Sequence, residues 1–149
     1  MKMNGICCNA LRVLNKYLPP KKIAHSLRVA QYALEDYDFF EYPAIEDYED
    51  VFITAILHDV VEDSECTFED LKQEGIPEYC INWIKELTKA DDEEYLHYVQ
   101  RVGKGSAMAV IIKRADMKDH LLLEDTLTDK LKNKYLPAIP YILWKRRCY

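Results

Sequence analysis

The segment Val51-Phe-Ile-Thr-Ala-Ile-Leu-His-Asp-Val-Val-Glu-Asp63 places four ionisable side chains at the end of an otherwise apolar run. The apolar residues predict a buried helix. If that helix continues to Asp63, His58 stacks with Glu62 and Asp59 with Asp63, because residues four apart lie on nearly the same helical face. Desolvating these groups is costly unless a bound ion offsets the cost. Imidazole and carboxylate ligands together suit a first-row divalent ion such as Mn, Fe, Co or Zn, so the segment predicts a metal site.

Further ligands can come from two other helical stretches, because one histidine and one aspartate leave coordination positions open. His25 lies in the stretch 21–37, and Asp116 lies in the apolar stretch 107–123. A single histidine in a helix is more often a surface or core residue than a ligand, so only the other three candidates promote His25. The predicted metal ligands are His25, His58, Asp59 and Asp116.

The order of these residues, a histidine, then His-Asp, then an aspartate, resembles the HD superfamily of metal-dependent phosphohydrolases. Further blocks resemble the RelA/SpoT-type alarmone hydrolase domain and its small single-domain relatives, over roughly residues 21–123. The resemblance implies a compact, all-α HD-domain bundle that removes the 3′-pyrophosphate from guanosine tetra- or pentaphosphate. The matching blocks are His25-Ser-Leu-Arg-Val-Ala30, Leu57-His-Asp-Val-Val-Glu-Asp-Ser64, Thr67-Phe-Glu-Asp-Leu71, Leu87-Thr-Lys89, Glu94-Tyr-x-x-Tyr98 and Lys113-Arg-Ala-Asp116.

A metal-assisted hydrolysis also needs carboxylates and cations around the ion. A divalent ion lowers the pKa of a bound water and polarises a phosphoryl oxygen; we expect Mn²⁺ first, with Fe, Co, Zn or Mg as alternatives. Glu62 and Asp63 are the predicted catalytic residues, which orient the water or shuttle its proton. Phosphate charge requires cationic or hydroxyl partners. The predicted substrate-binding residues are Lys22, Arg28, Lys89, Tyr98, Lys113 and His120.

Two departures from the resembling family leave the substrate open. The relatives carry an asparagine four residues after the last aspartate ligand, whereas this chain has His120, which can hydrogen-bond as an amide does, ligate a metal or gain charge. The family's Gly-x-Pro-Tyr loop and the arginine before the first histidine are replaced by Leu18-Pro-Pro-Lys-Lys-Ile-Ala24. The alternatives are therefore a hydrolase of other nucleotides or nucleoside phosphates, a non-catalytic nucleotide-binding HD module, and an HD nuclease.

The length predicts one domain over residues 1–149, and the resemblance implies that it is an HD domain. Only 4 glycines and 6 prolines favour long helices, and the net charge of −6 argues against nucleic acid or an anionic membrane as a partner. Five cysteines, without a secretory signal or an apolar run of membrane-spanning length, predict a reduced, cytoplasmic protein. The expected partner is a small phosphorylated molecule, a nucleotide first, and the oligomeric state stays open.

Local signals predict where several helices begin and end. Thr67-x-x-Asp70 predicts a capping box for a short helix that ends at Gly75, and Pro137 and Pro140 should interrupt the last helical stretch, 127–149. Lys113, Asp116 and His120 should share one helical face. Apolar spacing predicts helices over 6–18, 21–37, 51–63, 67–75, 77–87, 95–103 and 107–123.

Overall fold

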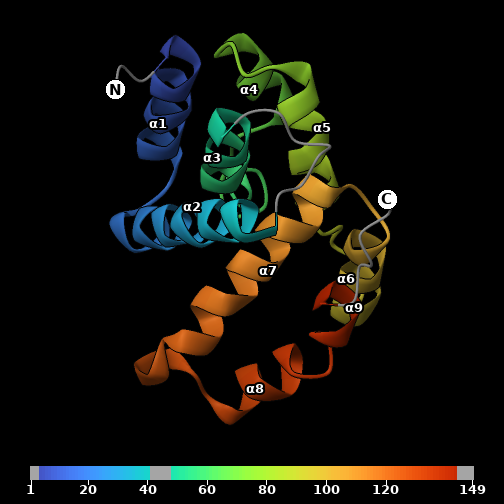
Figure 1. Ribbon diagram of the computed structural model, residues 1–149. Helices are drawn as coiled ribbons and strands as arrows, with labels where there is room; N and C mark the ends of the chain where they lie inside the picture. The colour runs from blue at the N-terminus through green and yellow to red at the C-terminus, as the bar shows by residue number, and fades with distance from the viewer. Residues whose placement is uncertain (1–3, 41–47, 144–149) are drawn as a thin grey trace.

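The computed structural model describes residues 4–40 and 48–143, and these residues form helices and connecting turns with no β-strand among them (Figure 1). The prediction of an all-α fold is therefore confirmed. None of the described helices combines the length and the apolar character needed to cross a bilayer. The elements are α1 (Gly5–Tyr17), α2 (Pro20–Phe40), α3 (Tyr48–Leu57), α4 (Phe68–Gln73), α5 (Glu78–Leu87), α6 (Tyr95–Gly103), α7 (Ala107–Leu122), the 3-10 turn η1 (Glu124–Thr126), α8 (Asp129–Tyr135) and α9 (Pro140–Leu143).

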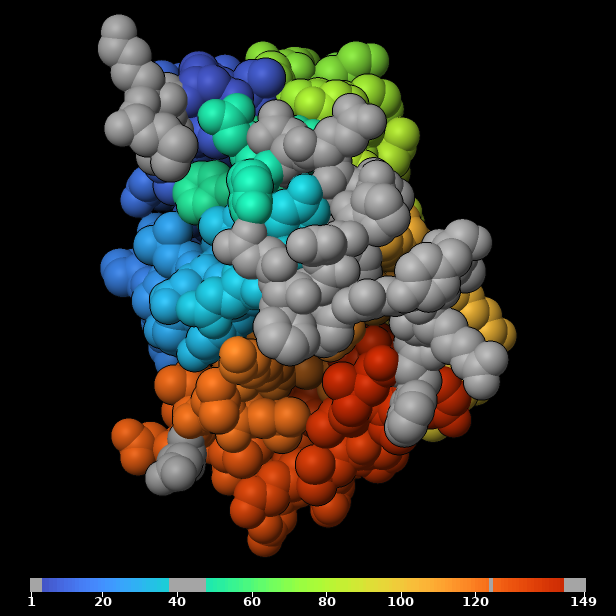
Figure 2. Space-filling model, viewed as in Figure 1, coloured from blue at the N-terminus to red at the C-terminus, as the bar shows by residue number. Residues whose placement is uncertain are grey.

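Helix α7 connects the two ends of the molecule. It packs against α2, α3, α5, α6, α8 and α9, and α2 in turn packs closely against α3 (Figure 1). Figure 2 shows the side chains of α7, in orange, lying against those of the C-terminal helices, in red. Three elements that are distant in sequence, α2, α7 and the end of α3, therefore meet in one place.

The part of α3 after its first turn is apolar because other helices surround it. Helix α3 packs against α1, α2, α5 and α7, and Val51 and residues 53–57 are buried, whereas Tyr48 in the first turn is exposed. Ile53, Ile56 and Leu57 are fully buried, and burial of each such side chain stabilises the fold by about 1.5–3 kcal/mol. Because four neighbouring helices hold α3, the position of the turn that follows Leu57 is fixed as well.

The prediction that this helix continues to Asp63 is wrong, because α3 ends at Leu57 and residues 58–63 form turns. Nδ1 of His58 lies 2.6 Å from the carbonyl oxygen of Ala55, the acceptor that the next helical N–H would use. The backbone N–H of Val60 then bonds to Leu57 at 3.1 Å, three residues back rather than four. One bond four residues back remains, from the Asp63 N–H to the Asp59 carbonyl at 2.9 Å, so residues 58–63 keep a single helical turn but do not continue α3.

Three other local predictions are confirmed. Thr67 and Asp70 form the capping box, with the Asp70 N–H 3.1 Å from Thr67 Oγ1 and the Thr67 N–H 2.8 Å from an Asp70 carboxylate oxygen. Gly75, at φ 83°, ends α4 in the left-handed conformation that glycine adopts without strain. The prolines act as expected, since α8 ends before Pro137 and α9 starts at Pro140; residues 144–149 of the predicted last stretch lie outside the described residues.

Candidate metal centre

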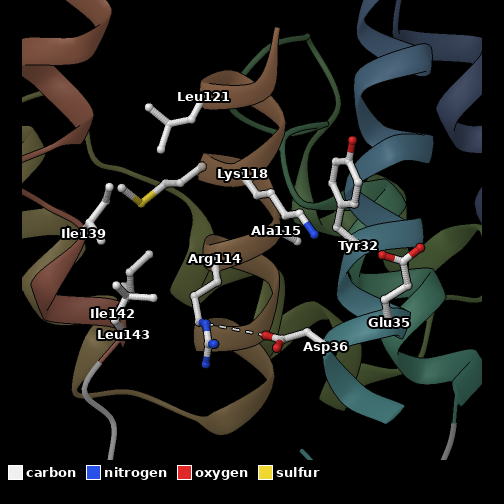
Figure 3. Close-up of a pocket in the computed structure, with 11 residues that line it drawn as sticks. Tyr32, Glu35, Asp36, Arg114, Ala115, Lys118, Leu121, Ile139, Ile142 and Leu143 are labelled. Atoms are coloured by element: carbon white, nitrogen blue, oxygen red, sulfur yellow. Dashed lines mark ion pairs between the residues drawn. The ribbon is translucent and has the colours of Figure 1, made fainter. Parts of the chain in front are cut away.

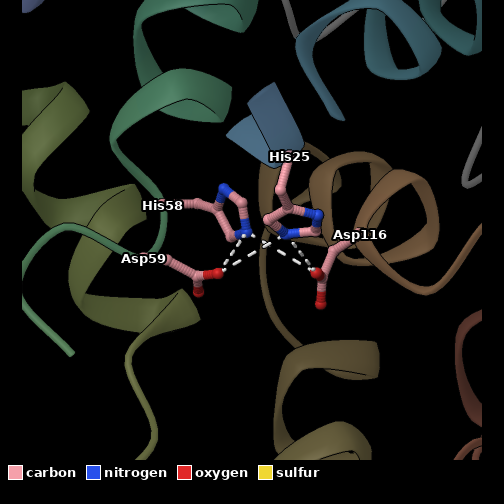
Figure 4. A group of neighbouring side chains, drawn as sticks. All are labelled: His25, His58, Asp59 and Asp116. Atoms are coloured by element: carbon pink, nitrogen blue, oxygen red, sulfur yellow. Dashed lines mark ion pairs between the residues drawn. The ribbon is translucent and has the colours of Figure 1, made fainter. Parts of the chain in front are cut away.

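The four predicted metal ligands converge on one point (Figure 4). His25 comes from α2, His58 and Asp59 come from the turn after α3, and Asp116 comes from α7. Each offers one ligand atom, and these atoms all lie within 4.8 Å of one another. Nε2 of His25 is 3.1 Å from Asp116 Oδ1, and Nε2 of His58 is 3.1 Å from Asp59 Oδ2. This convergence is what the metal-site hypothesis requires.

The hydrogen bonds of the two histidine rings engage Nδ1 and leave Nε2 of each ring for a metal. Nδ1 of His58 donates to the Ala55 carbonyl, and Nδ1 of His25 lies 2.7 Å from Asp119 Oδ2, so Nε2 of each ring faces the centre. Among the described residues, His25 Nε2, His58 Nε2 and Asp116 Oδ1 are buried polar atoms without a hydrogen-bond partner. Such atoms are costly, and a divalent ion would satisfy all three with a nitrogen and oxygen donor set that suits it.

The charges of the cluster favour a cation. Burial lowers the pKa of His25, but the neighbouring carboxylates of Asp116 and Asp59 outweigh this effect and raise the pKa to about 9. Burial raises the pKa of Asp116, but the charge of Lys113 and the neighbouring histidines hold that pKa well below its ordinary value. The carboxylates therefore stay ionised, and a metal would compete with protons for the histidines.

Helix α7 presents Lys113, Asp116 and His120 toward the pocket, which confirms that they share a face. Lys113 is only 6% exposed, and its ammonium lies 2.7 Å from Asp116 Oδ2. Nε2 of His120 lies 3.2 Å from Asp116 Oδ1, and the ring stacks on Tyr135 at 5.1 Å with an interplanar angle of 12°. The second oxygen of Asp116 is thus paired, while the first faces the histidines.

The two predicted catalytic carboxylates have different surroundings. Glu62 is exposed, and its Oε1 accepts a hydrogen bond of 2.8 Å from the backbone N–H of Lys89. Partial desolvation raises the pKa of Glu62, and the nearby charges of Asp59 and Asp63 act in the same direction. Asp63 pairs instead with the Lys22 ammonium at 2.8 Å. Glu62 is therefore the better placed proton acceptor of the two.

A pocket of about 450 Å³ lies beside the cluster and is lined by three of the convergent residues, His25, Asp59 and Asp116. All six predicted substrate-binding residues line it, together with Lys21, Lys134 and Tyr135. The high density of ammonium and guanidinium groups suits a substrate with several phosphates.

Several of these side chains already have partners within the protein. The Tyr98 hydroxyl donates to the carbonyl of Leu87 at 2.5 Å, and the Lys89 ammonium donates to the carbonyl of Ala90 at 2.9 Å. Arg28 pairs with Asp119 and Lys113 with Asp116. Their contacts with a substrate stay predictions, and such contacts would have to coexist with these internal bonds.

Sequence reasoning missed three residues of this region. Asp119 could have been found, because it lies three residues after Asp116 in a helix that is otherwise largely apolar. Lys134 and Tyr135 carry no motif, and only the folding of α8 against α7 brings them to the pocket. The ammonium of Lys134 lies 4.4 Å from the centre of the Tyr95 ring, which makes this lysine part of an aromatic wall.

A second cavity, of about 460 Å³, is lined by residues of α2, α7 and α9 (Figure 3). Its lining is largely apolar and includes Met117, Leu121 and Ile142, with an Arg114–Asp36 ion pair at 3.5 Å. None of the four convergent residues lines it.

Fold and site together define an all-α protein with a candidate His/Asp metal centre. The fold is similar to the solved structure of a metazoan ortholog of SpoT that hydrolyzes ppGpp and plays a role in starvation responses. The match has a TM-score of 0.72 and 20% sequence identity, and it covers 97% of this chain and 89% of that one.

A curated relative supports the same comparison at the level of sequence. The chain is 37% identical over 79 residues to the guanosine-3′,5′-bis(diphosphate) 3′-pyrophosphohydrolase MESH1 of Drosophila melanogaster. This match covers 49% of the chain and 42% of the relative, so it spans less than half the length of that protein. No family model matches the chain. The resemblance to alarmone hydrolases that the motifs indicated is confirmed by these similarities.

Proposed function

We propose that this chain is a metal-dependent phosphohydrolase that acts on a nucleotide, with guanosine 3′,5′-bis(diphosphate) as the leading substrate. The observation that carries the proposal is the convergence of His25, His58, Asp59 and Asp116 beside a pocket that is lined by Glu62 and several cations. The names of the two relatives support the choice of substrate. The proposal includes residues 1–149 as one domain, supported by the contacts of α7 with six other helices.

The four convergent residues would hold one divalent ion, with Mn²⁺ as the first choice. Two carboxylates beside two imidazoles form a harder donor set than the thiolate sites typical of structural zinc. When bound, the ion would lower the pKa of a water and polarise a phosphoryl oxygen.

The remaining residues would handle the proton and the phosphate charge. Glu62 accepts a proton from the attacking water, and its raised pKa brings it closer to the operating pH at which a general base works best. The Lys89 N–H holds the Glu62 carboxylate in position. Lys21, Lys22 and Lys134, all in the lining of the pocket, offset the charge of the phosphates.

The packing of His120 supports a second class of substrate. The position four residues after Asp116 holds His120, whose ring is packed between His25 and Tyr135. A ring fixed in this way shapes the pocket differently from a small amide, which favours other nucleotides or nucleoside phosphates as the alternative. A purely binding role is disfavoured by Glu62, since binding alone requires no proton acceptor.

The test is a panel of nucleotides incubated with the Mn²⁺-loaded protein. We expect release of pyrophosphate from guanosine 3′,5′-bis(diphosphate) and loss of that release when the metal is chelated. Hydrolysis of another nucleotide would select the alternative substrate. Tight binding of nucleotides with no turnover of any of them would overturn the hydrolase proposal in favour of a binding module.

A further inference from the structure

Asp119 is a carboxylate buried beside the candidate metal centre without being one of the convergent residues. It is 1% exposed and lies on α7, one turn beyond Asp116. Its Oδ2 is 2.7 Å from Nδ1 of His25, and its Oδ1 accepts a bond of 2.7 Å from Nε of Arg28. Nη2 of Arg28 adds a second bond, 3.0 Å from Oδ2. Both carboxylate oxygens are therefore engaged.

We propose that Asp119 is a positioning residue that fixes the ring of His25, with Arg28 as its clamp, so that Nε2 of His25 is presented to the metal. The proposal rests on the metal site of the proposed function. It assigns Arg28 to the support of this site, whereas the sequence predicted a contact with substrate.

The geometry explains why a charged group at this position is useful. A histidine can present either nitrogen to a metal, and the partner of the other nitrogen decides which one is free. A carboxylate that accepts from Nδ1 holds the proton there and increases the basicity of Nε2. Asp119 thus acts on His25 as the Ala55 carbonyl acts on His58, but with a full negative charge.

The hydrogen bonds from Arg28 offset the free-energy cost of burying the Asp119 carboxylate. An unpaired buried charge is strongly destabilising, whereas a bidentate guanidinium satisfies both oxygens. The hydrogen bonds from Arg28 and His25 hold the pKa of Asp119 below its ordinary value against the effect of burial. Asp119 therefore stays ionised. His25 and Arg28, which lie one helical turn apart on α2, set the orientation of its carboxylate.

The chain offers a matched control for the test. Asp36 of α2 pairs with Arg114 of α7 at 3.5 Å, so it also links these two helices, but it lies at the second cavity (Figure 3). Loss of this pair reports the purely structural effect of removing one carboxylate from the α2–α7 packing.

The experiment measures Mn²⁺ affinity by calorimetry for the wild type, Asp119→Asn and Asp36→Asn. We expect Asp119→Asn to weaken Mn²⁺ binding about 10- to 100-fold, the usual effect of losing such a support. Asp36→Asn should bind within about threefold of the wild type, as expected for a site with no shared partner. Equal affinities for the wild type and Asp119→Asn would overturn the proposal, as would a wild type that binds no divalent ion.

A second readout is independent of activity. Long-range ¹H–¹⁵N spectra of the Zn²⁺-loaded wild type should show His25 protonated at Nδ1 and bound through Nε2, and Asp119→Asn should lose or shift the Nδ1–H signal.

If Asp119→Asn does not fold, Arg28→Gln provides a second test. It changes a half-exposed side chain, removes the guanidinium that holds Asp119, and should weaken Mn²⁺ binding about three- to tenfold. Unchanged affinity in that variant would overturn the proposal. Weakened metal binding in a protein that hydrolyses no nucleotide would refute the proposed function and leave the role of Asp119 standing.

Discussion

Replacing Glu62 by glutamine should separate metal binding from turnover. The change removes one negative charge and the ability to accept a proton, and it preserves the shape of the side chain. Oε1 of the glutamine can still accept the 2.8 Å bond from the Lys89 N–H, so the loop stays in place. Glu62 is not among the convergent residues, so the ion should remain bound.

The expected loss of turnover in Glu62→Gln follows from the loss of one function, the acceptance of a proton. General-base catalysis contributes about 10²- to 10⁴-fold to a rate, so turnover should fall by that factor, or about 2.7–5.4 kcal/mol in activation free energy. The free energy of unfolding should change by less than about 0.5 kcal/mol, because the side chain is exposed and its one hydrogen bond persists. Turnover of the wild type should decline as the pH falls through the raised pKa of Glu62, starting above the pH at which an ordinary glutamate takes up its proton.

The assay measures metal content and pyrophosphate release on the same preparations. Asp59→Asn is the contrasting variant, because it removes a proposed ligand and should lose both metal and turnover. Asp63→Asn is the matched control, since its carboxylate pairs with Lys22 and should matter less than Glu62. If Glu62→Gln lost its metal as fully as Asp59→Asn, or kept full turnover, the reasoning would be refuted.

Three further predictions test the site and the fold. Mn²⁺ at about 100 times its Kd should raise the free energy of unfolding by about 2.7 kcal/mol, measured by thermal denaturation, and Asp59→Asn should abolish the gain. Thr67→Ala should lower the free energy of unfolding by about 1 kcal/mol through loss of the capping box, with Mn²⁺ affinity unchanged in calorimetry; a larger loss would contradict a purely local cap. His120→Asn should retain Mn²⁺ but lose about 0.5–1.5 kcal/mol of stability from the Tyr135 stack and shift the KM for nucleotide; an unchanged KM would leave His120 with a packing role alone.

The sequence predicted the convergent residues because buried charges need partners. His58 and Asp59 follow an apolar run, and Asp116 lies in a largely apolar stretch, so their placement is costly unless they meet. His25 lies in a helix with many charged residues, and only the other three candidates promoted it. Helical period alone put Lys113, Asp116 and His120 on one face. The ligand positions could therefore be inferred before any tertiary contact was known.

Other features could not be predicted, because they depend on contacts that hydrophobic periodicity does not encode. The end of α3 at Leu57 results from the bond between the His58 side chain and the Ala55 carbonyl, and the apolar pattern of Val60 and Val61 gives no sign of it. The contribution of Tyr135 depends on how a seven-residue helix docks on α7.

Helix α7 shows how one element can serve a charged site and an apolar core together. One face carries Lys113, Asp116 and His120 into the pocket, while another carries Met117 and Leu121 to the second cavity. Each buried charge of α7 that faces α2 or the pocket has an opposite charge beside it, Lys113 for Asp116 and Arg28 for Asp119. Because these pairs already neutralise one oxygen of Asp116 and both oxygens of Asp119, the unsatisfied Asp116 Oδ1 is left to the histidines and to a cation. The pairing thus leaves Asp116 Oδ1 and the carboxylate of Asp59 as the negative groups beside His25 and His58, where a divalent ion would bind.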